Sequence, residues 1–314
     1  MNKQIALGLL AAVAASGAFA QSSVTVYGRL NVTVESVKHG DEDRQNEVDN
    51  NSSRIGFKGT EDLGGGLKAG FQIEHGFDPT TGTASATFWG RQAEVNLSGG
   101  FGTVRLGTFT PDSYYATSDY IGMHNHETGD SSDALYGFNT YVTQNKVGYV
   151  TPNLSGFQGF ISVAEGVTGV TKKTWDLAGY YDRGPLHLGL GYSKRDDEKQ
   201  LAVRGLYEFG AFTVGGLVQR VSEPVIGDRT YFRVSGMYAF GANELHLNVG
   251  RTGEYSDLDN TDALQWTVGY NYNLSKRTKV YGYYTRISGD GSPLYTPHGT
   301  DGFNAFALGI RHNF

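Results

Sequence analysis

Two groups of charged residues, opposite in sign, are the side chains in this sequence best suited to act on a solute. The polar stretch of residues 110–143 contains no lysine or arginine, and five carboxylates lie in it: Asp112, Asp119, Glu127, Asp130 and Asp133. Four cations lie in segments of alternating polarity: Arg29, Arg54, Lys58 and Arg105. Groups of this kind attract, repel or orient charged solutes through their electric field, without breaking a bond.

The sequence offers little for catalysis or for metal binding. It has no cysteine and no G-x-S-x-G motif, and its run of three glycines, residues 64–66, leads into Leu67 rather than into a phosphate-binding G-K-[ST]. His124 and His126 lie near acidic residues and could hold a metal or act as a base, but H-x-H in a polar loop is a weak signal. Acidic residues 41–51 and 257–262 lack the spacing of a calcium-binding loop. We therefore predict no enzymatic activity, no cofactor and no metal site.

The four cations belong to segments in which apolar and polar positions alternate, as they do in half-buried β-strands. In residues 24–34 every even-numbered position is apolar or glycine, so Arg29 lies on the opposite, polar face. The apolar residues that flank Arg54, Lys58 and Arg105 place these three side chains on polar faces in the same way. The last twelve residues, 303–314, alternate as well and end on an aromatic residue, Phe314.

Tight turns and longer polar connections follow one another along the chain. The short turns are expected at residues 62–66, 99–102, 153–155, 182–185, 209–210, 241–242 and 273–276. The long connections are expected at residues 36–50, 78–87, 110–143, 165–173, 194–199, 222–228, 252–262 and 288–302. Seven turns on one side and eight loops on the other predict sixteen antiparallel strands, an even number that closes a transmembrane β-barrel with both termini on the short-turn side.

The amino terminus has the pattern of a secretory signal peptide. Lys3 precedes an apolar run at residues 5–15, and residues 18–20, Ala-Phe-Ala, have the small-x-small form of a cleavage site. We expect residues 1–20 to be a signal peptide and residues 21–314 to form a single barrel domain. The apolar run is too short to span a bilayer, and no later segment approaches about 20 consecutive apolar residues.

The composition fits a barrel that is apolar outside and wet inside. The 314 residues include 45 Gly, 20 Tyr and 17 Phe, and the aromatic residues gather near the ends of the expected strands, as in the girdles of outer-membrane barrels. The net charge of −6 argues against nucleic-acid binding. A secreted β-sandwich or β-helix would share several of these features, and composition alone does not separate them from a barrel.

Five stretches resemble a known family. They are residues 23–30 (S-V-T-V-Y-G-R-L), 52–66 (S-S-R-I-G-F-K-G-T-E-D-L-G-G-G), 99–107 (G-G-F-G-T-V-R-L-G), 273–278 (N-L-S-K-R-T) and 309–314 (G-I-R-H-N-F). In this order and spacing they are similar to the trimeric general porins of β-proteobacteria, such as those of Neisseria and of Burkholderia relatives. The resemblance implies a homotrimer with one pore in each subunit, and a third loop, here residues 110–143, that folds into the barrel and narrows the pore.

The resemblance also gives the two charged groups a common role. If the acidic third loop faces the inward cations across a narrow gap, a transverse field acts on solutes in the constriction. Relatives carry an arginine three residues before an asparagine after this loop, whereas this chain has Val142 before Asn145, so one constriction arginine is absent. The alternation places Arg91 on the outward face unless a bulge shifts the register, which keeps it out of the predicted set.

The sequence thus predicts passive transport of small hydrophilic solutes and ions across the outer membrane of a Gram-negative bacterium. A substrate-specific channel is the main alternative, because Tyr27, Tyr231, Tyr281 and Tyr283 face inward by parity. A barrel enzyme or an adhesin is a second alternative. The expected partners are two further copies of the chain, outer-membrane lipid and lipopolysaccharide, periplasmic chaperones and the barrel-assembly machinery, for which Phe314 would be the assembly signal. The sign of the ion selectivity stays open.

Overall fold

The computed structural model describes residues 23–119, 134–166 and 172–314. The predicted signal peptide, residues 1–20, lies outside the described residues. The described helices are short: α2 (Asp112–Tyr114), the π-helical turn η1 (Tyr115–Asp119), and the 3₁₀ turns η2 (Ser292–Leu294) and η3 (Pro297–Gly299). None of the helices in the described ranges has the length and apolarity needed to cross a membrane.

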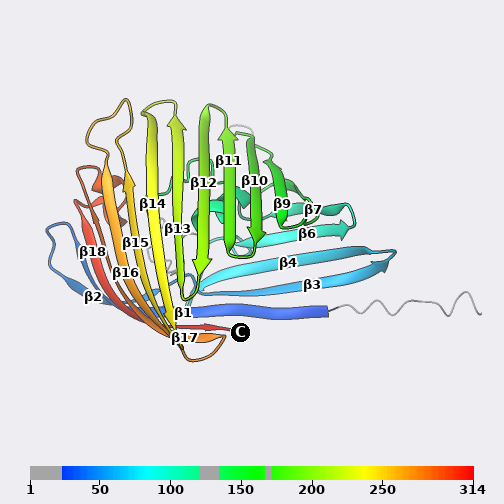
Figure 1. Ribbon diagram of the computed structural model, residues 1–314, viewed down its shortest axis with the longest axis horizontal. Helices are drawn as coiled ribbons and strands as arrows, with labels where there is room; N and C mark the ends of the chain where they lie inside the picture. Colours follow the sequence, from blue (N-terminus) through cyan, green and yellow to red (C-terminus); the bar gives the residue numbers. More distant parts are fainter. Residues whose placement is uncertain (1–22, 120–133, 167–171) are drawn as a thin grey trace, which may run out of the picture.

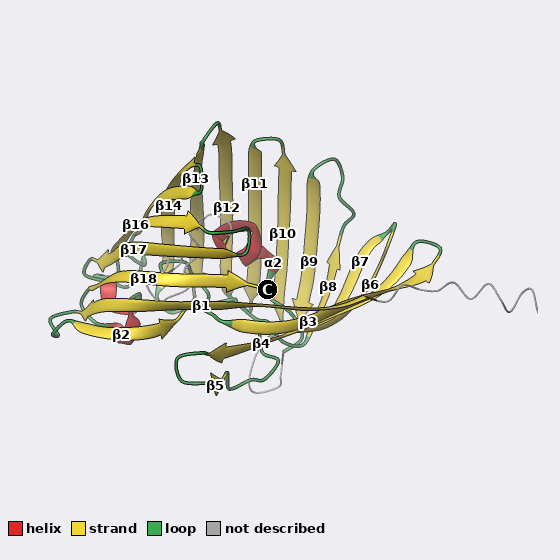
Figure 2. Ribbon diagram, turned by 90° about the horizontal axis from the view of Figure 1, so that it is seen from below, coloured by secondary structure: helices red, strands yellow, loops and turns green. Residues whose placement is uncertain are grey.

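The fold is one antiparallel sheet closed into a barrel, in which the strands follow one another round the wall in chain order (Figures 1 and 2). The strands of the wall are β1 (Ser23–His39), β3 (Arg54–Gly64), β4 (Leu67–Asp78), β6 (Gln92–Gly99), β7 (Gly102–Thr108), β8 (Lys146–Val150), β9 (Phe157–Ala164), β10 (Thr174–Arg183), β11 (Leu186–Arg195), β12 (Glu198–Phe209), β13 (Phe212–Glu223), β14 (Gly227–Phe240), β15 (Asn243–Thr252), β16 (Ala263–Asn273), β17 (Thr278–Ser288) and β18 (Phe303–Asn313).

Two short strands do not add to the ring. β2 (Gln45–Asn50) pairs with the outer half of β1, in line with β3, and β5 (Thr83–Ala84) pairs with the end of β4. Of the 18 strands in the sheet, 16 therefore form the closed wall, which confirms the predicted count.

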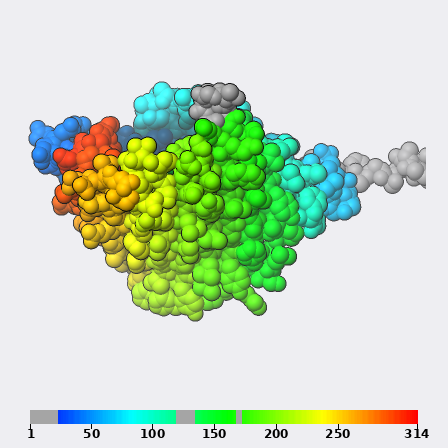
Figure 3. Space-filling model, turned by 90° about the horizontal axis from the view of Figure 1, so that it is seen from above, coloured from blue at the N-terminus to red at the C-terminus, as the bar shows by residue number. Residues whose placement is uncertain are grey.

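The two faces of the wall differ as the alternation predicts. On β1, the side chain of Val34 is 61% exposed, whereas its neighbours Thr33 and Glu35 are 1% and 3% exposed. Most outward positions of the strands are apolar, and most of the buried polar side chains point into the barrel. Figure 3 shows one side of the molecule, over which the green-to-yellow strands form a continuous outer surface. The apolar outside and polar inside are what a barrel in lipid requires.

The seven short turns and the eight longer connections lie where they were predicted, but several connections are shorter than expected. β1 extends to His39 and β2 begins at Gln45, so most of the predicted loop 36–50 is strand. Likewise, only residues 196–197 separate β11 from β12, instead of residues 194–199. Beyond the apolar band both faces of a strand are wet, so polar residues there pair as strands without the alternation that marks them in sequence.

The ring closes where the last strand meets the first. β18 pairs with β1 from Arg29 opposite Asn313 to His39 opposite Phe303. Phe314 continues this pairing, because its N–H donates to the Gly28 carbonyl and the Gly28 N–H donates to the Phe314 carbonyl, both at 3.1 Å. A Cβ on Gly28 would lie only 2.5 Å from Cζ of the Phe314 ring, so the ring occupies the space next to the Gly28 backbone. The absence of a side chain at Gly28 thus allows the terminal ring to cover the seam.

Deletion of Phe314 should impair barrel formation. The deletion removes both hydrogen bonds to Gly28 and the ring that covers it, a loss of about 1–3 kcal/mol at the closing seam. The measurement is the fraction of refolded protein that keeps the electrophoretic mobility of a folded barrel in unheated samples. His312→Ala is the control, since His312 presents a neighbouring ring, 6.5 Å from that of Phe314, without bonding to Gly28. Equal folding of the wild type and the deletion variant would remove Phe314 from assembly.

Candidate pore constriction

The connection between β7 and β8, residues 109–145, is called loop L3 here, and its first half is held on the inner wall. Asp176 on β10 accepts a hydrogen bond from the Ser113 backbone N–H at 3.2 Å and another from the Ser113 hydroxyl. Arg204 on β12 donates from Nε to the Ala116 carbonyl at 2.8 Å. L3 therefore folds into the barrel instead of extending into solvent, and Figure 2 shows its helix α2 inside the wall.

The second half of L3 is held by the next strands round the wall. Gln219 on β13 accepts from the Gly137 N–H at 2.8 Å and donates to the Gly137 carbonyl at 3.2 Å. Arg229 on β14 donates to the Leu135 carbonyl at 3.0 Å. Each anchor is a buried polar side chain bonded to loop backbone, so both partners are satisfied away from bulk water.

Two inward glycines on β11 let the loop approach the wall this closely. A Cβ on Gly189 would meet the Ala116 carbonyl oxygen, and a Cβ on Gly191 would lie 2.6 Å from the Ser113 carbonyl oxygen. The loop also packs against itself, because the Tyr114 ring contacts the rings of Tyr136, Phe138 and Tyr141, with centroids 5.9, 5.5 and 5.7 Å away. The described parts of the loop thus pack against each other and dock on β10 to β14.

Among the five predicted acidic residues, Asp112 is the one whose side chain lies in the described part of L3. It begins α2, and its Oδ1 lies 3.2 Å from Nη1 of Arg105. Burial raises the pKa of Asp112 to about 6, with a further rise from Asp176, although the Arg105 charge opposes this shift. Asp119 is the last residue of η1. Glu127, Asp130 and Asp133, like His124 and His126, lie outside the described residues.

Arg105 lies at the base of L3 rather than free in the lumen. Its Nη2 is 2.8 Å from Oε2 of Glu94, its Nη1 meets Asp112, and its guanidinium lies 4.1 Å from the centroid of the Phe109 ring. Lys146, which the sequence reading had not assigned to the site, lies 4.3 Å from the same centroid and donates to the Phe109 carbonyl at 3.2 Å. These two cations fix the point where the loop leaves β7.

The other predicted cations lie across the barrel from the docked loop. Arg29 on β1 and Arg54 on β3 are paired directly, so both side chains point to the inner face. Lys58 lies four residues after Arg54 on β3 and therefore on the same face, with its Nζ 5.2 Å from the centroid of the Tyr27 ring. Because β3 and β12 are separated by half of the ring, these cations face the wall that carries L3.

Arg91 corrects the expectation drawn from parity. Its Nε lies 2.7 Å from Oε1 of Glu74, a carboxylate of the inner face that is also 3.6 Å from Nε of Arg54. Arg91 precedes β6, which begins at Gln92, so the alternation of the strand does not govern its side chain. One carboxylate, Glu74, therefore holds two guanidinium groups on the inner face of the barrel.

Two more cations of this wall were not among the predicted site residues. Lys279 on β17 and Arg311 on β18 are directly paired, and Arg311 is opposite Asn31 of β1. Nε of Arg29 donates to Asn313 at 3.2 Å, which brings Arg29 close to the same group. The signal was present, since alternation alone puts Arg311 and Lys279 on the inner face. We call Arg29, Arg54, Arg91, Lys279 and Arg311 the basic wall.

A closed sixteen-stranded barrel with an inward loop facing a wall of cations has the geometry of a water-filled pore. The model of the Gram-negative porin family matches residues 6–292 of the sequence. The chain belongs to this family. It is therefore an outer-membrane β-barrel of a Gram-negative bacterium and a general diffusion channel, in a family whose members are channels and not enzymes.

Relatives from β-proteobacteria share most of the length of this porin. It is 34% identical over 313 residues to outer membrane porin protein 32 of Delftia acidovorans, covering 87% of this chain and 86% of the relative. It is 27% identical over 346 residues to major outer membrane protein P.IB of Neisseria meningitidis serogroup B, covering 94% and 95%. The predicted resemblance to β-proteobacterial porins is confirmed.

Solved structures share the fold of this porin. The anion-selective porin from Comamonas acidovorans superposes with a TM-score of 0.78 at 27% identity, over 94% of this chain and all of that one. The trimer form of OmpT from Vibrio cholerae superposes with a TM-score of 0.70 at 16% identity, over 93% of this chain and 99% of that one. At the lower identity the likeness concerns the fold.

The charge of Asp112 should make part of the ion selectivity of the porin depend on pH. With a pKa of about 6, Asp112 is a carboxylate at pH 8 and neutral at pH 5, while Arg105 stays charged. Acidification should therefore lower the cation-to-anion permeability ratio, by a factor on the order of two for one charge at the loop base. The measurement is the reversal potential in asymmetric KCl from pH 8 to pH 5.

The control for this experiment is a comparison of two variants. Asp112→Asn should lose the part of the pH dependence that has a midpoint near 6, whereas Asp62→Asn, a change at an exposed residue near the end of β3, should keep it. An unchanged pH profile in Asp112→Asn would show that this carboxyl does not act on permeating ions.

Proposed function

We propose that the porin selects solutes between L3 and the basic wall, and that it passes anions more readily than cations. Small hydrophilic solutes would cross the gap between the docked loop and the strands β17, β18, β1 and β3. The sequence of the loop contains Asp112, Asp119, Glu127, Asp130 and Asp133. The opposite side of the barrel carries Arg29, Arg54 and Lys58, while Arg105 holds the loop base. Charges of opposite sign across a narrow aqueous gap produce a transverse field that orients dipolar solutes.

The observation that supports an anion preference is the excess of cations on the basic wall. Five cations, Arg29, Arg54, Arg91, Lys279 and Arg311, come from strands that are neighbours in the ring or from the residue just before β6. The described carboxylates near them are Glu74, shared by Arg54 and Arg91, and Glu244, 3.9 Å from Lys279. The wall thus keeps net positive charge. A similar porin, that of Comamonas acidovorans, is described as anion-selective.

Burial of the inward tyrosines supports general diffusion over a specific sugar channel. Tyr231, Tyr281 and Tyr283 are 0%, 4% and 3% exposed, so their rings do not form a surface along which a sugar could slide. The Tyr281 hydroxyl donates to Asn31 at 2.7 Å, and the Tyr27 hydroxyl accepts from Gln72 at 2.7 Å. These side chains support the wall, and passage is governed by size and charge.

Removal of basic-wall charge should reverse or weaken the anion preference. The double variant Arg29→Gln and Arg54→Gln leaves Arg91 on Glu74, so it does not strand that carboxylate. We expect its cation-to-anion permeability ratio to rise about two- to fivefold, because fewer fixed cations attract anions into the constriction. The measurement is the reversal potential in planar bilayers with asymmetric KCl.

The matched control is Arg183→Gln, which removes an exposed cation at the short-turn end of β10. Its ratio should equal that of the wild type. A wild-type pore that favours cations, or a double variant with an unchanged ratio, would contradict the proposed role of the basic wall. Liposome swelling with solutes of equal mass and different chemistry should show no sharp preference among neutral solutes.

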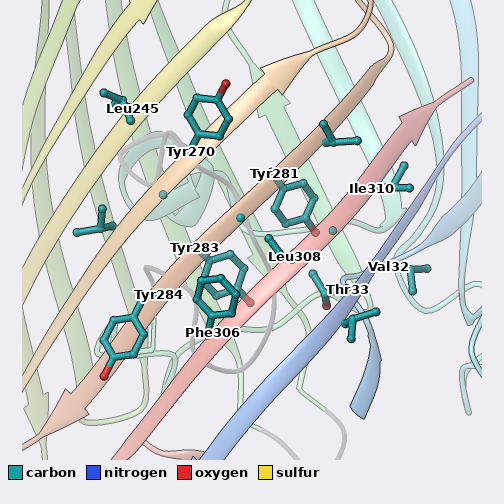
Figure 4. Close-up of a pocket in the computed structure, with 16 residues that line it drawn as sticks. Val32, Thr33, Leu245, Tyr270, Tyr281, Tyr283, Tyr284, Phe306, Leu308 and Ile310 are labelled. Atoms are coloured by element: carbon teal, nitrogen blue, oxygen red, sulfur yellow. The ribbon is translucent and has the colours of Figure 1, made fainter. Parts of the chain in front are cut away.

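We also propose that the porin is a homotrimer assembled through the seam of the first and last strands. The outer face over β15 to β18 and β1 has an apolar hollow of about 870 Å³, lined by residues such as Val34, Val268 and Leu308 (Figure 4). A large exposed apolar surface of this kind is suited to contact between subunits. Vibrio cholerae OmpT has been described in a trimer form. Periplasmic chaperones and the barrel-assembly machinery, acting on the strand that ends at Phe314, belong to the same proposal.

Polar substitutions at this seam should lower the number of chains in each particle. Wild-type porin in detergent should have the mass of three chains by light scattering, and Leu308→Ser with Ile310→Ser should shift it toward one, because the seam loses apolar contact area. Val218→Ser with Val234→Ser makes the same change on the outer faces of β13 and β14 and should leave three chains. A monomeric wild type, or equal dissociation of both variants, would contradict this contact face.

A further inference from the structure

On the strands β11 to β17 and on β1, the cations of the outward rows lie near one end of the barrel. Along the outward rows of these strands and β1, the basic residues lie at the long-loop, extracellular end: Lys38, Lys194, Lys199, Arg220, Arg251 and Arg286. At the short-turn end the outward rows carry aromatic rings instead, with Phe209, Phe212, Tyr238 and Phe240 stacked in series. The outward surface therefore distinguishes the two leaflets of the membrane by charge.

Two of these cations face each other across neighbouring strands. Lys194 on β11 is directly opposite Lys199 on β12, and like charges in opposed positions of a sheet repel. The nearby carboxylates are engaged elsewhere: Asp196 is 3.2 Å from Lys172, and Glu198 is 2.7 Å from Arg195. Within the described residues, neither lysine of the pair forms an ion pair. The exposed Asp197 lies at the tip of the same turn.

An apolar hollow lies on the outer wall directly below this pair, over β9 to β12, which run side by side (Figure 1). Its volume is about 550 Å³, and it is lined by Phe157, Leu177, Leu190, Tyr192 and Val203 among others. Tyr192 precedes Lys194 on the outward row of β11, so the hollow leads up to the lysine pair. Trp175, opposite Lys194, borders the same position.

Gly179 lines this hollow and Gly159 lies beside it, at positions where the fold does not need glycine. Gly159 on β9 and Gly179 on β10 are directly opposed on the outward face. Neither has a positive φ, and a Cβ on either would find its nearest neighbour at ordinary contact distance, 3.4 Å and 3.5 Å. A larger side chain would therefore fit at each position, and its absence leaves space for another molecule. At about 3.3 Å per residue, Gly179 lies about 13 Å below Trp175 and the lysine pair.

We propose that this outward face is a binding seat for lipopolysaccharide, with a phosphate of its lipid A part between Lys194 and Lys199 and an acyl chain in the hollow at Gly179. The seat lies on the outside of the barrel and rests on the outer-membrane location of the porin, not on its ion selectivity. It gives the lysine pair an anion at close range, because the nearby described carboxylates are paired with other cations, including Asp228 with Arg220 at 3.0 Å.

The position and the charge favour lipopolysaccharide over other occupants. The cations lie at the extracellular leaflet, where a lipid with phosphates on a sugar backbone and several acyl chains complements both the lysine pair and the hollow. The aromatic short-turn end lacks a comparable pair on its outward rows, which argues against general affinity for phospholipid. A second copy related by a twofold axis would bring its own lysine pair against this one, and the two would repel.

Binding of purified lipid A tests the proposal. Porin refolded in detergent without lipopolysaccharide is titrated with diphosphorylated, hexa-acylated lipid A, and bound lipid is counted by native mass spectrometry. Lys194→Gln with Lys199→Gln should weaken binding about 10- to 30-fold, the loss expected for two cations near a phosphate surface. Gly179→Leu should weaken binding by filling the hollow, with the phosphate contacts left in place.

Two matched controls separate this seat from nonspecific charge and from misfolding. Lys276→Gln with Arg277→Gln removes an exposed basic pair from the β16–β17 turn, and Gly216→Leu fills an outward glycine on β13 where a Cβ would be 3.5 Å from its nearest neighbour. Both should bind lipid A like the wild type. All variants should keep wild-type conductance and reversal potential, which shows that the barrel is folded and that the pore proposal is tested separately.

Three results would overturn the assignment. They are wild-type affinity in the Lys194 and Lys199 double variant, an equal loss in the Lys276 and Arg277 control, or binding of phosphatidylglycerol as tight as that of lipid A. The last outcome would identify the surface as a general site for anionic lipid.

Discussion

Closure of the sheet between β18 and β1 is the constraint on which the rest of this porin depends. In hydrocarbon an unpaired backbone N–H or carbonyl costs several kcal/mol, so a sheet can cross the membrane only if no edge is left. The pairing of Phe314 with Gly28 continues the ladder to the last residue. Once the ring is closed, the two faces of each strand have different solvents, and the alternation of side chains follows from that difference.

The closed ring also makes an interior in which buried polar groups find hydrogen-bond partners that offset the cost of their burial. Asp176, Arg204, Gln219 and Arg229 are each at most 4% exposed, and each bonds to the backbone of L3 or to Ser113. On the surface of a soluble protein, water would compete with the backbone for hydrogen bonds to such side chains. Here they bond to the backbone groups of a loop that has folded into the barrel. Docking of the loop therefore supplies hydrogen-bond partners to the loop backbone and to the polar side chains of the wall at the same time. The constriction is therefore held by hydrogen bonds more than by an apolar core.

The strand count, the turns and the inward or outward direction of most side chains could be predicted from sequence, because a period of two survives wherever one face meets lipid. The prediction fails where that difference in solvent ends. Residues 36–39 and 45–50 pair as strands beyond the apolar band, and Arg91 precedes β6, so parity placed it on the wrong face. Arg105 illustrates another limit: parity gives its direction, but its burial between Glu94 and Asp112 depends on where L3 docks, which no local pattern encodes.

The net charge of the chain does not determine the selectivity of its pore, because a charge acts on a permeating ion only when it lies close to that ion. The chain carries a net charge of −6, yet the described wall opposite L3 is rich in arginine. Charges in exposed outer connections are screened within about 8–10 Å at moderate ionic strength, whereas charges in a narrow, partly desolvated gap act on every ion that passes. Selectivity therefore depends on a few side chains near the constriction. Cations on the outward rows, separated from the lumen by the wall, act instead on what surrounds the barrel.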